Sequence, residues 1–239
     1  GIETAGGLCE QIIACNTTIP CRKSKIFTTA QDAQDMVRVH IIQGEREMSE
    51  DNKSLGFLEL HGLPPAPRGL PEIEVIFELD SNGILHVHAR DKGTGRSQST
   101  RIVSNSGISA DDIEVMIKEA ESHRSRDRER RATAEARNQL DGLVYTSRRS
   151  LEEYADAVSA SDAMNIRESI SMAEAVLESN NMDALTKARE RLALSAEKLS
   201  ESIYAAARRE VDYNTPMFGT SSPGGGPAVS IEDDMVDDE

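Results

Sequence analysis

The sequence predicts an α+β protein of two segregated domains, an antiparallel β-sandwich followed by a small bundle of α-helices. Three observations lead to this prediction. Up to residue 104, apolar and polar residues alternate with a period of two, which is typical of strands with one buried face. Beyond residue 109, apolar residues recur at intervals of three and four, as on one face of a helix. No proline occurs in residues 72–215, so helices can extend over long spans there.

The β-sandwich prediction rests on short runs in which apolar and polar residues alternate. In the clearest run, Val37, Val39 and Ile41 fall on one face of a strand, and Arg38 and His40 fall on the other. The same reasoning predicts strands at 8–14, 25–29, 55–60, 73–79, 85–89 and 96–104. Turn residues, several of them glycine, separate these runs. This spacing favours antiparallel sheets over a parallel sheet with crossover helices.

The helical part is predicted in three pieces. Ser109 and Asp112 have the spacing of a capping box, so we expect a helix to start there. Seven of the eight residues in 124–131 are charged, and a helix that is polar on all sides usually crosses solvent between domains. We therefore expect one long helix from Arg124 to about Asp156. Two antiparallel helices follow from apolar-periodic positions at Ala163, Ile166, Ile170, Ala173 and Leu177, and at Leu185, Ala188, Leu192, Ser195 and Leu199.

These patterns set the expected domain boundaries. Residues 1–108 should form the β-sandwich and residues 109–212 the helical domain. Residues 213–239 are rich in glycine, proline and serine and end in six acids and no base over 231–239. We expect this last part to be a disordered acidic tail.

Composition excludes several classes of function. A net charge of −15 repels phosphate backbones, so nucleic acid is not expected as a partner. No run of eighteen apolar residues could span a membrane, and residues 1–5 show no secretory signal. Cys9, Cys15 and Cys21 match no zinc or redox motif, which favours a reducing compartment. His86 and His88 share a strand face and could bind zinc, but no third ligand is evident, so we expect no metal site and no catalytic residues.

Several ordered blocks of sequence resemble the seventy-kilodalton heat-shock chaperones of the DnaK type. They are GIET at 1–4, NTTIP at 16–20, QGER at 43–46, DNKSLG at 51–56, PAPRG at 65–69 and DSNGILHV at 80–87. The resemblance runs from Gly1 to about Arg209. It implies the substrate-binding β-sandwich and α-helical lid from the C-terminal part of such a chaperone, without the ATPase domain. We therefore expect no enzyme activity and no cofactor in this chain, since ATP and Mg²⁺ belong to the absent domain.

The resemblance also implies a peptide-binding site in the sandwich. Its pocket for one apolar side chain of the substrate would be lined by Ile2, Thr4, Phe27, Val37 and Val39. Two residues would arch over the bound peptide, and they correspond to Ala5 and Ala30. Bacterial relatives usually carry a larger apolar residue at the position of Ala5, so we expect a lower arch and faster peptide release here.

Closing contacts of the lid are implied in the same way. Arg68 lies on a rigid loop, 62–71, that holds four of the eight prolines. By resemblance it pairs with Asp127 and Asp141 on the long helix. A second contact in the family joins a loop aspartate to a lid histidine, and here it would join Asp32 to Tyr145. A phenol can donate to a carboxylate, but it removes pH sensitivity near neutrality.

The function implied is that of a molecular chaperone that binds extended hydrophobic segments of unfolded polypeptides and assists their folding. The expected partners are these polypeptides, a J-domain co-chaperone and a nucleotide-exchange factor, with no membrane and no nucleic acid. The expected location is the cytoplasm of a bacterial-type cell or an organelle of bacterial origin. The alternative is an interaction scaffold that uses the helices or the acidic tail without holding clients. The tail does not end in the Glu-Glu-Val-Asp of cytosolic eukaryotic relatives.

Overall fold

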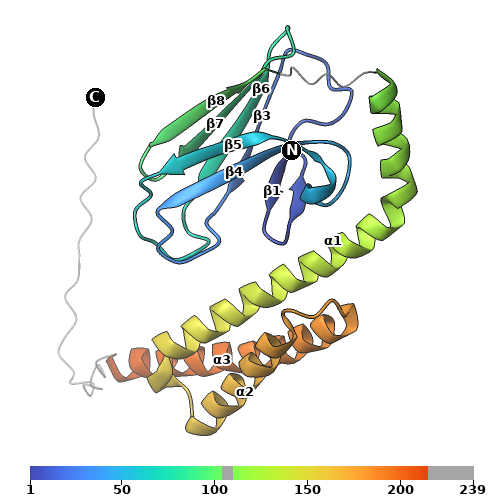
Figure 1. The fold of residues 1–239 in the computed structure, drawn as a ribbon. Coiled ribbons are helices and arrows are strands. Elements are labelled where there is room, and N and C mark those ends of the chain that lie inside the picture. The colour runs from blue at the N-terminus through green and yellow to red at the C-terminus, as the bar shows by residue number, and fades with distance from the viewer. Residues whose placement is uncertain (104–109, 215–239) are drawn as a thin grey trace, which may run out of the picture.

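A computed structural model describes residues 1–103 and 110–214 of the chain. The N-terminal part forms two antiparallel sheets of four strands each (Figure 1). One sheet has the order β2-β1-β4-β5 and the other the order β3-β6-β7-β8. The strands are β1 (Ile2–Thr4), β2 (Leu8–Glu10), β3 (Cys21–Phe27), β4 (Met36–Gln43), β5 (Lys53–His61), β6 (Ile73–Leu79), β7 (Leu85–Asp91) and β8 (Ser97–Ile102). The helices are η1 (Ser49–Asp51), α1 (Ala110–Glu153), η2 (Ala155–Ala157), α2 (Ala160–Val176) and α3 (Met182–Asn214).

The two sheets share one hydrophobic core. Ile41 and Leu60 from the first sheet and Val75, Phe77 and Val87 from the second are at most 2 % exposed and belong to one cluster. Their alternate spacing along each strand is the pattern that predicted the strands. The α+β class is therefore confirmed, with a β part built from antiparallel strands.

Strand pairing moves several predicted boundaries. β3 begins at Cys21, not at Lys25, because it pairs with β6 from Cys21 opposite Leu79 to Phe27 opposite Ile73. The side chains between its ends are exposed, so no alternation marked its start. β2 ends at Glu10, since its partner β1 has only three residues.

The helical part contains one helix more continuous than expected. α1 runs unbroken over 44 residues from Ala110, so the predicted helix start near residue 109 and the long helix from Arg124 are one element. Ser109, the expected capping residue, lies outside the described residues. No described helix is both long enough and apolar enough to cross a bilayer.

α2 and α3 pack against the C-terminal half of α1, and Figure 1 shows α1 running from the sheets to this pair. Leu140, Val144 and Leu151 of α1 join a second core with residues of α2 and α3. The α2 and α3 members are Ala163, Ile166, Ile170, Ala173, Leu185, Leu192 and Leu199, all at predicted positions. α3 extends to Asn214, two residues past the predicted domain end, and the rest of the predicted tail lies outside the described residues.

Candidate functional site

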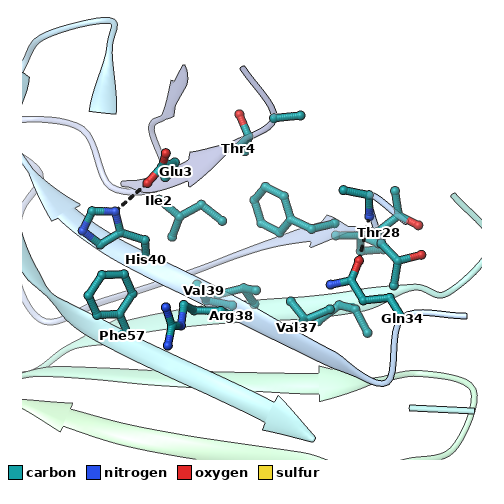
Figure 2. A pocket seen from close by; sticks show the side chains of 17 residues that line it. Ile2, Glu3, Thr4, Thr28, Gln34, Val37, Arg38, Val39, His40 and Phe57 are labelled. Atoms are coloured by element: carbon teal, nitrogen blue, oxygen red, sulfur yellow. Dashed lines mark hydrogen bonds and ion pairs between the residues drawn. The ribbon is translucent and has the colours of Figure 1, made fainter. Parts of the chain in front are cut away.

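An apolar cavity of about 710 Å³ opens between β1, β4 and the segment that follows β3 (Figure 2). Its lining includes all seven residues predicted for the pocket and the arch, namely Ile2, Thr4, Ala5, Phe27, Ala30, Val37 and Val39. Ile2 and Val39 are buried, whereas Phe27 and Val37 are half-buried. Ala5 and Ala30 are exposed. The fold thus gathers two distant stretches of sequence around one cavity with an apolar floor.

The strand that carries Ile2 and Thr4 is braced from the side. His40 Nδ1 lies 2.6 Å from Glu3 Oε2, and His40 Nε2 lies 2.8 Å from Ser54 Oγ. The imidazole also stacks on Phe57, with ring centroids 4.4 Å apart. This group ties β1 to β4 and β5 at one end of the cavity, as Figure 2 shows.

The other end of the cavity is held by Gln34. Its Oε1 accepts hydrogen bonds from the backbone N–H groups of Ala30, at 3.1 Å, and Gln31, at 3.3 Å. Sequence reasoning missed both Gln34 and His40. Neither has a local signal, because each acts through a partner that is placed by a turn or a neighbouring strand.

α1 contacts the turn that follows β1. Asn138 Nδ2 donates to the backbone oxygen of Ala5 at 2.8 Å. The next residue, Gly6, has a φ of +79°, and a Cβ there would lie 3.2 Å from Asn138 and 3.3 Å from Ala134. Only glycine permits this approach without strain. The helix therefore rests directly on the residue predicted to arch over the cavity.

A second contact joins α1 to the proline-rich loop. Arg68 Nη1 lies 2.7 Å from Asp141 Oδ2, and Nη2 donates to the Asp141 backbone oxygen at 3.1 Å. The Arg68 guanidinium also lies over the Tyr145 ring, 4.1 Å from its centroid. Asp141 and Tyr145, both on α1, thus contact the same arginine.

Asp32 completes this group. Its Oδ1 accepts from the Tyr145 hydroxyl at 2.6 Å and from the Arg68 backbone N–H at 2.8 Å. These two hydrogen bonds lower the pKa of Asp32 from its ordinary value. The carboxylate in turn raises the pKa of the Tyr145 hydroxyl above its ordinary value. The four side chains, Asp32, Arg68, Asp141 and Tyr145, form one cluster.

Asp127 does not belong to this cluster, which corrects the predicted pairing of Asp127 with Arg68. Asp127 and Asp141 are fourteen positions apart on one helix, about 21 Å along its axis, so one arginine cannot reach both. Asp127 binds Arg46 instead, with Arg46 Nε donating to Oδ2 at 2.5 Å and Nη2 to Oδ1 at 3.0 Å. Asp127 is 2 % exposed, and the hydrogen bond from Arg46 lowers its pKa.

Further ion pairs surround the Arg46 contact. Arg130 pairs with Glu50 and with Asp51, the latter at 2.8 Å, and Arg131 pairs with Glu47 at 2.7 Å. The acids come from the segment between β4 and β5. Ion pairs therefore anchor α1 to the β part at two places along its length, at Arg46 with its neighbours and at Arg68, on either side of the hydrogen bond from Asn138 to Ala5.

These features define a class of α+β protein in which an apolar cavity on one sheet is bordered by exposed small residues and by a helix hydrogen-bonded to one of them. The comparison with protein families makes the assignment specific, because the family described as Hsp70 protein matches residues 1–205. The chain belongs to the Hsp70 family. This membership makes it a chaperone-type protein of the heat-shock response and of protein folding. It also brings unfolded polypeptides and co-chaperones as the general partners of the family.

The family match also corrects a prediction. We expected no enzyme, on the ground that the ATPase domain of the family is missing from this chain. The matched family is ATPase-containing, and the match covers residues 1–205, so that prediction is wrong. Among the described residues, no group of three or more His, Cys, Asp or Glu side chains could hold a metal ion, and His86 and His88 gain no third ligand there.

Proposed function

We propose that the chain holds extended hydrophobic segments of unfolded polypeptides in the cavity between β1 and β4. In this proposal, residues 1–108 form a peptide-binding β-sandwich of the DnaK type, residues 109–212 form a helical lid and residues 213–239 form an acidic tail. One observation carries the proposal. The seven residues expected at the peptide site line a single apolar cavity, and α1 is bonded to one of them.

The binding energy would come mainly from one buried side chain of the client. Burying a leucine in an apolar pocket contributes about 2 kcal/mol. An extended client can add hydrogen bonds between its backbone and that of the protein, as a strand does when it joins a sheet. Such binding is weak and tolerant of sequence, which suits a protein with many clients.

The helical lid must open for clients to enter. The Arg68–Asp141 pair is partly exposed, since the Asp141 side chain is 47 % accessible. Exposed pairs contribute about 0–1 kcal/mol, so thermal motion can break this contact. Asp32 and Tyr145 would close together with it.

Family membership supports co-chaperones as partners in general, and the proposal extends this to particular partners, a cofactor and a compartment. A J-domain co-chaperone and a nucleotide-exchange factor would act on the chain. ATP with Mg²⁺ would be the cofactor. We assign no described residue to ATP or Mg²⁺. A bacterial-type cytoplasm, or an organelle of bacterial origin, would be the compartment.

The test is to measure binding of a fluorescent extended peptide with one central leucine. Val37→Phe should fill the cavity and weaken binding about tenfold or more, because the leucine loses its burial. Val103→Phe makes the same change at an exposed position outside the cavity lining and should leave binding unchanged. If the unaltered chain retains no leucine peptide, or if both variants bind like it, the proposal is wrong.

A further inference from the structure

A second cavity, of about 530 Å³, lies where α1 meets the β part and the connection between α2 and α3. It is lined by Gly6 and Met48 on the β side and by Asn180 on the other side. Its remaining wall is α1, which contributes three arginines, Arg126, Arg130 and Arg137. We call it the arginine cavity. A volume of this size accommodates a small ligand.

The three arginines lie on one face of α1. Arg126, Arg130, Thr133 and Arg137 follow one another at intervals of four, three and four, which is the spacing of a single helical stripe. Glu129 is the only acid among the lining residues. The cavity wall is therefore cationic, although the chain as a whole has a net charge of −15.

Two of these arginines lack an acidic partner. Arg130 pairs with Glu50 and Asp51, so its charge is already balanced. Arg126 forms no ion pair with any carboxylate among the described residues, whereas Arg130 and Arg131 on the same helix do. The charge of Arg126 is therefore available to a ligand.

Arg137 also lacks an acidic partner. Its Nη2 donates only to neutral acceptors, the backbone oxygen of Ser179 at 3.2 Å and Asn180 Oδ1 at 2.9 Å. Its Nε is buried and has no hydrogen-bond partner within the part of the chain that the structure describes. A buried donor without an acceptor costs free energy, so the protein itself satisfies the Arg137 guanidinium only in part.

We propose that the arginine cavity is a binding site for an oxyanion, a phosphate or a carboxylate group, held between Arg126 and Arg137. The planar guanidinium matches both oxyanions with two parallel N–H donors. This site is separate from the client cavity, with no lining residue in common. Both arginines belong to α1, so a bound anion is held by this helix, at the place where α1 faces the β part and the α2–α3 connection.

Two sources of the oxyanion fit the chain. One is a free phosphate compound. The other is the acidic segment 231–239, which carries six carboxylates and no base. Residues 215–239 span up to about 80 Å when extended. α3 is about 50 Å long, and Asn180 lies just before its start, so the acidic segment can reach the cavity.

The test is calorimetric titration of the full chain with pyrophosphate. We expect one saturable site per chain and about tenfold weaker binding in Arg126→Gln and in Arg137→Gln, because each loses one charge-assisted contact. Arg90→Gln, at an exposed position on β7, is the matched control and should bind like the unaltered chain. The Arg126 side chain is exposed and makes no hydrogen bond to another described residue, so its variant should fold normally even if Arg137→Gln does not.

A second arm separates the two sources. In a full-chain variant, the six acids of 231–239 are replaced by their amides. Tighter pyrophosphate binding by this variant means that the acidic segment occupies the cavity, and unchanged binding means that a free phosphate compound does. The proposal is overturned if neither form of the chain binds pyrophosphate saturably. It is equally overturned if Arg126→Gln and Arg137→Gln bind within twofold of the unaltered chain.

Discussion

Arg46 and Asp127, which lie 81 residues apart, form a two-pronged ion pair at the point where α1 first anchors to the β part. Asp127 is 2 % exposed and the Arg46 side chain is 17 % exposed, so water screens this pair far less than the Arg68–Asp141 pair. The two anchors of α1 therefore differ in strength. The Arg46 anchor should hold while the Arg68 anchor opens.

Removing the buried carboxylate should destabilise the protein. Asp127→Asn removes the buried, two-pronged partner of Arg46 and leaves that arginine only its 3.2 Å ion pair with Asp51, so we expect the free energy of unfolding to fall by about 2 kcal/mol. Asp141→Asn is the matched change at the exposed anchor and should cost less than about 1 kcal/mol. Denaturant unfolding of both variants measures the difference. Equal losses would show that burial does not distinguish the two anchors.

The same carboxylate should make stability depend on acid pH. Because Arg46 lowers the pKa of Asp127 below its ordinary 3.8, the contribution of Asp127 to stability is complete above about pH 5. It is lost as the pH falls through 3.8 toward the folded-state pKa. Between pH 6 and pH 2.5, the midpoint temperature of thermal unfolding should therefore fall more steeply for the unaltered chain than for Asp127→Asn. Parallel curves would contradict the assignment.

Tyr145 should make closure of α1 insensitive to pH near neutrality. The pKa of Asp32 lies below its ordinary value and that of Tyr145 above its own, so neither group titrates between pH 6 and pH 8. In Tyr145→His, a protonated imidazole would pair with Asp32 at pH 6 only. Peptide release should then be about threefold slower at pH 6 than at pH 8 in the variant. Stopped-flow dissociation of the fluorescent peptide measures this, and an identical pH profile for both chains would exclude it.

Gly6 should be required for the approach of α1. Gly6→Ala forces a side chain into a backbone conformation with a φ of +79° and places its Cβ 3.2 Å from Asn138. Gly83→Ala has the same backbone strain, with a φ of +77°, but meets no atom within 4 Å. We expect about 1 kcal/mol of destabilisation for Gly83→Ala and about 2–3 kcal/mol for Gly6→Ala. Chemical denaturation measures both losses. Equal values would mean that α1 moves away from the new side chain at no cost in stability.

Ala5 should set the rate of peptide release. Ala5→Met enlarges the side chain at the edge of the client cavity, so a bound peptide is covered more fully and should dissociate several-fold more slowly. The dissociation rate of the leucine peptide provides the measurement. An unchanged rate would show that Ala5 does not cover the peptide.

Local pattern was sufficient for the elements whose burial repeats regularly. The positions of Ala163, Ile166 and Ile170 followed from helical spacing, and those of Val39 and Ile41 from strand alternation. The cavity residues came from matching sequence blocks. No periodicity distinguishes Ile2 or Phe27 as lining residues, because a pocket wall and a core wall are equally apolar.

Local sequence pattern could not predict which residues far apart in the chain contact one another. Nothing in the charged run 124–131 tells which of its acids is buried or which arginine it meets, because charge runs are common on solvated helices. Arg46 pairs with Asp127 because the tertiary structure places the segment between β4 and β5 against the first half of α1. Burial and hydrogen-bond distance depend on where two segments meet in space, whereas the order of residues determines only which faces of each segment are apolar.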